Sequence, residues 1–163
     1  MAQSVDLFRE EAKHIRLTAL LAAERHYASE TPWYHMVYYL GIPSTILSAV
    51  AGAAAFSKIE KSEIVAGSIS IIVAILTSLM TFLDPTKKAE LYHSTAKSYE
   101  VLYHQSGYFG RVDLAKENPD ISKCEETLAS LVAQLNELNK SSPSIGGEHI
   151  ELRRKILKKI AGK

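Results

Sequence analysis

The sequence has one cysteine, Cys124, among 163 residues, and its charges nearly balance, with 19 Lys and Arg against 18 Asp and Glu. A single cysteine excludes an internal disulfide and any cysteine-rich zinc or iron–sulfur site. A net charge of +1 gives no reason to expect a nucleic-acid partner. With 8 Gly and 5 Pro, the chain is not a low-complexity or collagen-like sequence. Composition therefore indicates an ordinary domain length and no particular chemistry.

Motifs that carry catalytic chemistry are also missing. The sequence has no glycine-rich phosphate loop, no nucleophile elbow and no HExxH zinc motif. Its six histidines have no cysteine or carboxylate companions at ligand spacing. Cys124 lies in an apolar pattern, where a thiol is a small core residue more often than a nucleophile. We therefore expect a protein that is not an enzyme and that uses no metal or cofactor.

The most informative absence is local, because two long segments, 31–57 and 64–83, contain no Asp, Glu, Lys or Arg. Within them, 37–56 and 64–83 are apolar over 20 residues each. An α-helix needs about 20 residues to cross a hydrocarbon core of about 30 Å. The pattern predicts an all-α membrane protein, a two-transmembrane helical hairpin with long amphipathic cytoplasmic helices on both sides. The alternative is a buried hairpin at the centre of a soluble helical protein.

Aromatic and basic residues near the ends of these segments predict how the hairpin lies in a bilayer. Amphipathic rings favour the headgroup layer, so we expect an interfacial belt of Trp33, Tyr34, Tyr38 and Tyr39. The loop at 57–63 has two basic residues, fewer than the five that flank the segments, which are Arg16, Arg25, Lys87, Lys88 and Lys97. By the positive-inside rule, both termini are then cytoplasmic.

Three polar helices are expected outside the apolar segments, at about 6–28, 86–106 and 120–139, and together with the hairpin they form one domain over 1–140. Asp84 and Pro85 form a helix start, with Asp as the N-cap and Pro in the first helical position. Gly107 and Gly110 are expected to end that helix. Asp120 is expected to cap the last one.

The last predicted helix carries an apolar seam with heptad-like spacings of three and four residues. The seam packs either against the chain's own N-terminal helix or, as a coiled coil, against a second subunit. Its members are Ile121, Cys124, Leu128, Leu131, Leu135 and Leu138.

A basic tail follows the seam. The linker 141–147 is rich in Ser and Gly, and the tail 148–163 has six basic and two acidic residues. On a helical wheel the apolar residues of the tail fall within an arc of about 160°. A basic amphipathic helix of this kind suits an anionic membrane surface or a partner groove. The alternative is an ordinary solvated terminal helix.

Small and hydroxyl-bearing residues recur every four positions in both apolar segments. Such rows allow close packing between helices, within the hairpin or across a subunit boundary. The alternative is that part of the row lines an aqueous path between subunits, which requires a homo-oligomer because two helices cannot enclose a pore. No ionisable residue lies mid-segment, so a channel would be weakly selective or gated by an apolar constriction. The residues are Ser44, Ser48, Gly52, Ala66, Ser70, Ala74 and Ser78.

The order of these elements is similar to that of a known group. The second apolar segment ends in Phe82-Leu83-Asp84-Pro85, and it is followed by the pattern Ala89-Glu90-x-x-His93-x-x-Ala96-x-x-Tyr99. The first segment contains Leu40-Gly41-Ile42-Pro43-Ser44. These motifs resemble the SLATT family, small bacterial effectors with two transmembrane helices. The resemblance covers roughly residues 10–140 and leaves out the basic tail.

The resemblance implies an oligomeric effector of bacterial anti-phage defence that forms a pore or disrupts the membrane. It also implies a location in the inner membrane and a partner that senses or synthesises nucleotides. The alternative is a non-conducting membrane anchor or scaffold that recruits a soluble partner through its cytoplasmic helices.

Overall fold

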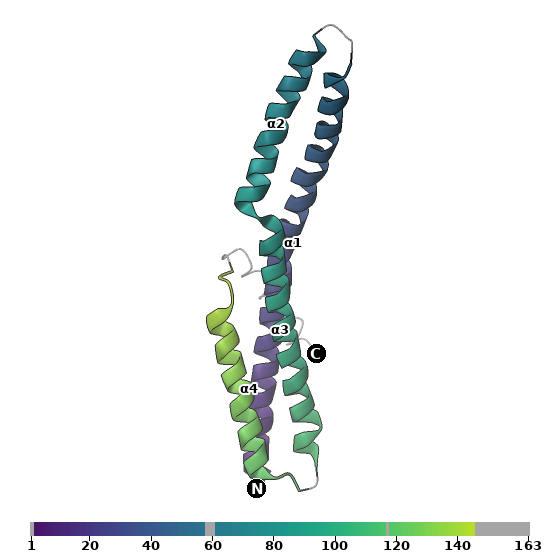
Figure 1. The fold of residues 1–163 in the computed structure, drawn as a ribbon. Coiled ribbons are helices and arrows are strands. Elements are labelled where there is room, and N and C mark those ends of the chain that lie inside the picture. The colour runs from purple at the N-terminus through teal and green to yellow at the C-terminus, as the bar shows by residue number, and fades with distance from the viewer. Residues whose placement is uncertain (1, 58–60, 117, 146–163) are drawn as a thin grey trace. The chain divides into compact units, whose positions relative to one another are not determined.

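The computed structural model describes residues 2–57, 61–116 and 118–145, and these residues form helices with no strand among them. The elements are α1 (Ala2–Ala55), α2 (Ser62–Leu83), α3 (Pro85–Arg111), a short 3-10 turn (Asp113–Ala115) and α4 (Ile121–Ser141) (Figure 1). The all-α prediction is confirmed. The predicted tail helix, 148–163, lies outside the described residues.

The chain divides into two compact units. The first combines residues 1–29 with 91–163 and is a three-helix bundle built from α1, α3 and α4. The second, Glu30–Glu90, is an antiparallel hairpin of the later part of α1 with α2, and it ends in the first turns of α3. Residues 1–140, which we expected to form one domain, are thus shared between both units.

α1 is one continuous helix, whereas the sequence predicts two separate helices over 6–28 and 37–56. The helix passes through Pro32 and Pro43, and both proline side chains are exposed. A proline removes one helical N–H, but its fixed φ is compatible with the α-conformation. Pro32 is the one helix-breaking residue between the two predicted helices, no glycine accompanies it, and the helix continues through it.

The core of the bundle pairs small side chains of α1 with large ones of α3. Ala12, Ile15, Ala19 and Ala23 recur every three or four residues and form one buried stripe on α1. The side chains that pack with them from α3 include Tyr99, Leu102 and Phe109. Fully burying a large apolar side chain contributes about 1.5–3 kcal/mol, so these contacts are the main stabilising term of the bundle.

Gly107 and Gly110 do not end α3, contrary to the prediction, because they serve the packing of α3 against α1. A Cβ at Gly107 would lie 3.2 Å from Nε of Arg16, and one at Gly110 would lie 3.8 Å from Cβ of Ala12. Glycine costs helix stability of only about 1 kcal/mol, which close packing can offset. The helix therefore continues to Arg111.

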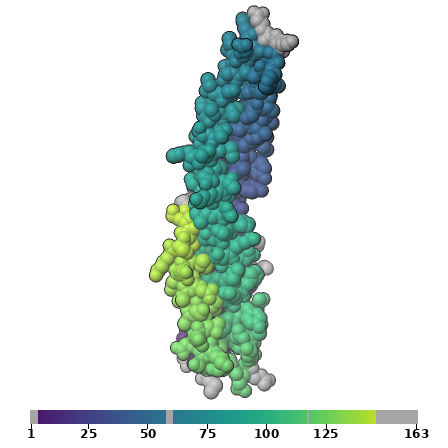
Figure 2. All heavy atoms as spheres, in the orientation of Figure 1, coloured from purple at the N-terminus to yellow at the C-terminus, as the bar shows by residue number. Residues whose placement is uncertain are grey.

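The apolar seam of α4 packs inside the bundle. Cys124 and Leu131 are buried in the core, and Leu128, Leu135 and Leu138 pack against it. Figure 2 shows α4 lying directly against α3. Because the chain's own helices cover these side chains, they are not free to form the coiled coil with a second subunit that was the alternative.

The helix caps predicted from sequence are present. The Asp120 side chain accepts a hydrogen bond from the backbone N–H of Lys123 at 3.3 Å, and α4 begins at the next residue. The Asp84 side chain accepts from the backbone N–H of Lys87 at 3.2 Å, directly before α3. Both are N-cap interactions that satisfy a donor left open at the helix start.

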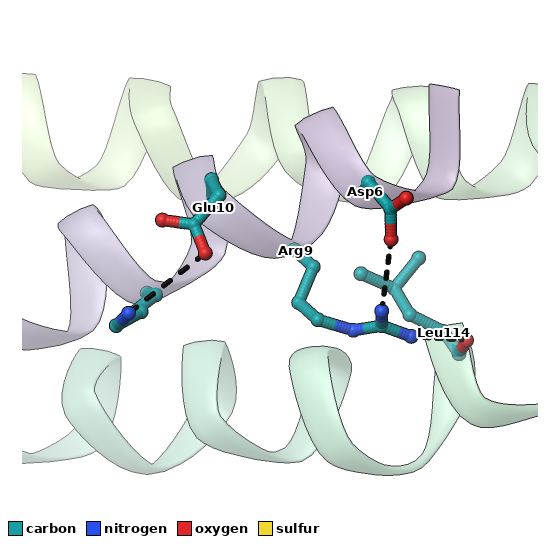
Figure 3. A network of polar contacts seen from close by, with 5 residues as sticks. Asp6, Arg9, Glu10 and Leu114 are labelled. Carbon is teal, nitrogen blue, oxygen red and sulfur yellow. Dashed lines mark hydrogen bonds and ion pairs between the residues drawn. The ribbon is translucent and has the colours of Figure 1, made fainter. Parts of the chain in front are cut away.

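Arg9 links the first turns of α1 to the far end of α3 within the bundle. One guanidinium nitrogen lies 3.1 Å from Oδ1 of Asp6, and another donates to the backbone carbonyl of Leu114 at 3.4 Å (Figure 3). Leu114 itself is buried in the core. The contact therefore holds the short 3-10 turn after α3 against α1.

Candidate functional site

Few residues in the apolar stretches of the hairpin are buried. The described residues contain two helical stretches that are long and apolar enough to cross a membrane: Ser4–Ala55, which belongs to α1, and Ser62–Ala115, which begins with α2. Their most apolar parts have mean hydropathies of 1.4 and 2.2. Only 6% of each of these parts is buried inside the protein, whereas the core helix of a soluble protein would be mostly buried. The alternative of a buried hairpin in a soluble protein is therefore not supported.

The two helices of the hairpin meet along a seam with spacings of three and four residues. At this seam a Cβ on Gly41 would lie 3.7 Å from Cε of Met80, an ordinary packing distance. The least exposed residues of each helix mark the rest of the seam: Val37, Leu40, Ser44, Leu47 and Ala51 in α1, and Ala66, Ile69, Val73, Leu76 and Met80 in α2. This is the spacing that keeps two antiparallel helices in contact over many turns.

The predicted rows of small residues divide between this seam and the outer surface. Ser44 and Ala66 are buried in the seam, whereas Ser48, Gly52 and the later members of the α2 row are exposed. A spacing of four residues advances about 40° per step around a helix of 3.6 residues per turn. Each row therefore starts in the seam and winds out of it. The exposed members in α2 are Ser70, Ala74 and Ser78.

The exposed parts of both rows lie on the same side of the hairpin. In each helix the exposed row is rotated from the seam by roughly 100° in the sense in which the helix winds. Because α1 and α2 run in opposite directions, the same rotation from facing seams brings both rows to one side. We call this surface the hydroxyl side, and its members are Thr45, Ser48, Gly52, Ser70, Ala74, Thr77, Ser78 and Thr81.

The other exposed surfaces of the hairpin carry large aliphatic side chains. Each of these side chains is more than two-fifths exposed; they are Ile46 and Val50 in α1 and Ile72 and Leu79 in α2. A single chain thus has one side of hydroxyls and small residues and another of branched hydrocarbon. The two sides suit different surroundings, since branched hydrocarbon matches lipid and small residues match another helix or water.

Several hydroxyls on the hydroxyl side donate to their own helix. Thr45 Oγ1 donates to the carbonyl of Gly41 at 2.9 Å, and Ser48 Oγ donates to that of Ser44 at 2.8 Å. In α2, Ser70 Oγ donates to the carbonyl of Ala66 at 2.8 Å. Each oxygen keeps lone pairs that can accept a hydrogen bond from water or interact with a cation. The hydroxyl side is therefore polar without containing a charge.

Ser44 differs from Ser48 and Ser70. It lies in the seam, and its hydroxyl oxygen is buried with no hydrogen-bond partner among the described residues. A buried hydroxyl without a partner costs about 1–3 kcal/mol, so this position weakens the middle of the seam.

The predicted aromatic belt lies at the start of the apolar part of α1. The Lys88 ammonium stands 4.2 Å from the centroid of the Trp33 ring, and the hydroxyl of Tyr38 donates to that of Tyr34 at 3.1 Å. Tyr39 is 75% exposed. Exposed phenols and a cation over an indole are typical of side chains at an apolar–aqueous boundary.

Asp84 ends α2 and begins α3. Its backbone is left-handed, with φ 41° and ψ 60°, and its N–H donates to the carbonyl of Met80 at 3.0 Å. Its side chain caps α3, and the Pro85 ring that follows is fully buried. A left-handed conformation is rare for residues other than glycine, and Asp is among the side chains that tolerate it best.

The motif residues that follow do not converge on one site. Phe82 is exposed, Leu83 is half-buried, and Ala89 is buried in the hairpin unit next to the exposed Glu90. Further along α3, in the bundle, Ala96 and Tyr99 are buried. The His93 ring meets the ring of Tyr27 edge to face at 5.7 Å. Ala96 and Tyr99 thus serve the packing of α3 in the bundle.

His26 is a functional candidate that the sequence analysis did not single out. It is 3% exposed, and burial, with a smaller contribution from Arg25, lowers its pKa from 6.5 to about 4. Its position three residues after Ala23 continues the buried stripe of α1, and this spacing is the signal that could have identified it.

The described residues contain no group of three or more His, Cys, Asp or Glu side chains that could hold a metal ion. A shallow groove of about 300 Å³ lies between α3 and α4. Neutral side chains dominate its lining, with Asp113 at one end, and its residues are Gln105, Tyr108, Phe109, Asp113, Thr127, Ser130, Leu131 and Gln134.

Comparison of the chain with family models, with curated proteins and with solved structures gives no match. The resemblance to the SLATT family therefore rests on the motif residues named above.

Proposed function

We propose that this protein is a membrane effector that assembles into a homo-oligomeric pore. In this proposal residues 37–56 and 64–83 cross the bacterial inner membrane, and both termini lie in the cytoplasm. The exposure of the apolar stretches supports the membrane location, because branched side chains such as Ile72 and Leu79 are stable against lipid and unfavourable in water. The basic flanks support the orientation.

The main support for a pore is the hydroxyl side of the hairpin. Its hydroxyl oxygens and glycine would gain nothing from lipid tails, whereas small residues allow close approach of another helix. If several hairpins associate with their hydroxyl sides inward, the branched side chains remain against lipid. The interior is then a neutral, hydroxyl-lined path. Such a lining predicts weak selectivity among small ions.

The resemblance to SLATT proteins supports a role in bacterial anti-phage defence. In this role a signal would open the pore and dissipate ion gradients, and a nucleotide-sensing or nucleotide-synthesising partner would supply the signal. The support for this partner and signal is the SLATT-like motif at the end of the second apolar segment.

A second candidate function, a non-conducting anchor that recruits a soluble protein, is favoured by one observation in the bundle. Val101 and Tyr108 on α3 and Val112 directly after it are each more than two-fifths exposed, and spacings of seven and four residues place them on one side. An exposed apolar row on a polar helix suits a protein partner.

Ion flux distinguishes the two functions. Purified full-length protein in vesicles with a K⁺ gradient should release K⁺, with and without added cyclic nucleotides. Substitution of Ser70 and Ser78 by leucine should stop the release, whereas Ile72→Leu on the lipid side should not. No flux from the wild-type chain under any condition, together with capture of a soluble protein that Tyr108→Ser abolishes, would favour the anchor.

Topology is tested separately with single cysteines in a Cys124→Ser background. Lys61→Cys, at the loop end of the hairpin, should react with an impermeant maleimide only from the periplasmic side. Thr86→Cys, at the start of α3, should react only from the cytoplasmic side. Reaction of Lys61→Cys from the cytoplasmic side would contradict the orientation.

A further inference from the structure

Glu63 is the one acidic or basic residue of α2, and it lies in the first turn of that helix. The apolar part of α1 that pairs with α2, 37–56, contains no Asp, Glu, Lys or Arg. The Glu63 side chain is exposed, and among the described residues no ion pair occupies it. Glu63 is therefore the one carboxylate carried by the two facing helices of the hairpin over 37–56 and 62–83.

Glu63 lies on the hydroxyl side of α2. Seven residues turn an α-helix by about 700°, which is two turns less about 20°. Glu63, Ser70 and Thr77 follow one another at this spacing, so they lie along one line of the helix, and all three are exposed. Ala66, which is buried in the seam, is about 60° away from Glu63 around the axis. The line of hydroxyls in α2 thus begins with a carboxylate.

The carboxylate stands at the loop end of the hydroxyl side. Ser70 lies about 10.5 Å further along the helix axis. The apolar segment 64–83 begins at the residue directly after Glu63. In a bilayer this position is the boundary between hydrocarbon and water. Glu63 is therefore at the mouth of any path that follows the hydroxyl side through the membrane.

We infer that Glu63 makes the pore selective for cations over anions. The inference rests on the proposed function, a homo-oligomeric pore with the hydroxyl sides inward. In that assembly each subunit contributes one carboxylate to the loop-side mouth, and the carboxylates form a ring that a single chain lacks. Such rings concentrate cations and repel anions at the entrance of cation channels. The hydroxyl lining behind the ring is neutral, so discrimination among different monovalent cations stays weak.

Two other electrostatic features lie near this mouth. The N–H groups in the first turn of α2 form the partially positive end of the helix dipole, and a glutamate there also stabilises the helix. Lys61 directly precedes the helix with a left-handed backbone, φ 66°, so the helical line of Glu63 and Ser70 does not extend to it. A test of Glu63 must therefore separate ion selectivity from helix stability and from the net charge of the mouth.

Reversal potentials of the full-length protein in planar bilayers test the inference. Under a KCl gradient, the wild-type pore should prefer K⁺ to Cl⁻ by about tenfold, and Glu63→Gln should reduce this ratio to near one. Glu63→Lys should invert the preference. The wild-type preference should also weaken at about 1 M salt, where the Debye length is about 3 Å.

The matched control moves the carboxylate by one residue. Glu63→Gln combined with Ile64→Glu keeps a glutamate in the first turn of α2 and leaves the net charge unchanged. The carboxylate is rotated by about 100°, away from the line of Ser70. Ile64 is 69% exposed, so the new side chain has room. This double variant should conduct with the same low ratio as Glu63→Gln alone.

A chemical version of the experiment avoids effects on folding. In a Cys124→Ser background, Glu63→Cys pores are opened first and then treated from the loop side with charged methanethiosulfonates. A reagent that carries a sulfonate should restore the preference for K⁺. A reagent that carries an ammonium group should give a preference for Cl⁻.

Three results would overturn the inference. An unchanged K⁺ preference in Glu63→Gln would remove Glu63 from the ion path and leave the pore itself standing. Recovery of the preference in the double variant would show that any carboxylate at this end suffices, which contradicts the placement of Glu63 on the hydroxyl side. Absence of conductance from the wild-type protein under every condition would overturn the pore and this inference together.

Discussion

The imidazole of His26 is stacked on the ring of Tyr99, with ring centroids 5.5 Å apart and an interplanar angle of 14°. The hydroxyl of Tyr99 donates to Oδ1 of Asn139 at 3.0 Å and accepts from Oγ of Ser142 at 3.1 Å. His26 is on α1, Tyr99 is on α3, and Asn139 is on α4. One aromatic stack therefore joins the three helices of the bundle at the end where α4 terminates.

The stability of the bundle should depend on pH through His26. Its pKa of about 4 in the folded protein is below the ordinary 6.5, so the unfolded chain takes up a proton first as the pH falls. The unfolding free energy should be highest above pH 6.5, decrease between 6.5 and 4, and change little below that through this group. The loss is at most about 3 kcal/mol. Denaturant unfolding in micelles at several pH values measures it.

The control is His26→Phe, which keeps a ring against Tyr99 and removes the titration. This variant should lose most of the decrease between pH 6.5 and 4, leaving the part due to carboxylates. The same pH dependence in both proteins would show that His26 does not contribute.

Leucine substitutions on the hydroxyl side should block conductance without preventing assembly. Ser70→Leu and Ser78→Leu each replace a hydroxyl by a bulky hydrocarbon on a surface that is exposed in the single chain. We expect single-channel conductance to be lost while the oligomer persists in chemical crosslinking. Ile72→Leu, on the lipid side, keeps its volume and should conduct normally. Unaltered conductance in both serine variants would remove these residues from the pore.

Ala74→Leu tests the alternative arrangement, in which the hydroxyl side packs closely against a neighbouring subunit and does not line a pore. Ala74 is exposed and does not lie in the seam, so a larger side chain leaves the packing of α1 on α2 unchanged. If the hydroxyl side meets a neighbouring subunit, the extra volume overpacks that contact at a cost of about 1–3 kcal/mol. The variant should keep its helical circular dichroism and lose crosslinked oligomers. Full assembly of the variant would count against a close helix contact at this position.

Substitutions of Asp84 should rank by backbone conformation as well as by capping. Asp84→Ala loses the cap of α3, worth about 1 kcal/mol, and keeps a left-handed backbone that alanine disfavours. Asp84→Gly loses the cap but relieves the backbone, and Asp84→Asn keeps a capping oxygen. We expect the unfolding free energy to be highest for the asparagine variant, lower for the glycine variant and lowest for the alanine variant. A glycine variant less stable than the alanine variant would contradict the role of the left-handed conformation.

The sequence predicts the element types of this protein well and the limits of its helices less well. Helix starts at Asp84 and Asp120 follow from local chemistry, since a side chain and a backbone N–H three residues apart decide them. The end of α3 does not follow from local chemistry. A glycine such as Gly107 ends a helix only where nothing packs against it, and here the Arg16 side chain lies against it. The missing information is the identity of the neighbouring helix.

The candidate site shows a similar division. The repeat of small residues is visible in the sequence, but Ser44 lies in the seam whereas Ser48, one step later, lies outside it. A regular spacing of four does not follow one face of a helix with 3.6 residues per turn. Which members face outward depends on where the seam lies, and the facing helix determines that.

The burial of Cys124 gives the natural protein a built-in reporter of its own motion. The thiol is 6% exposed and is the only one in the chain. A thiol reagent can therefore modify it fully only when α4 moves away from α1 and α3, and the labelling rate measures how often that happens. A labelling rate that exceeds the rate of global unfolding would identify α4 as a separately opening element. Any ligand or partner that tightens the bundle would slow the reaction, without a dye or an engineered residue.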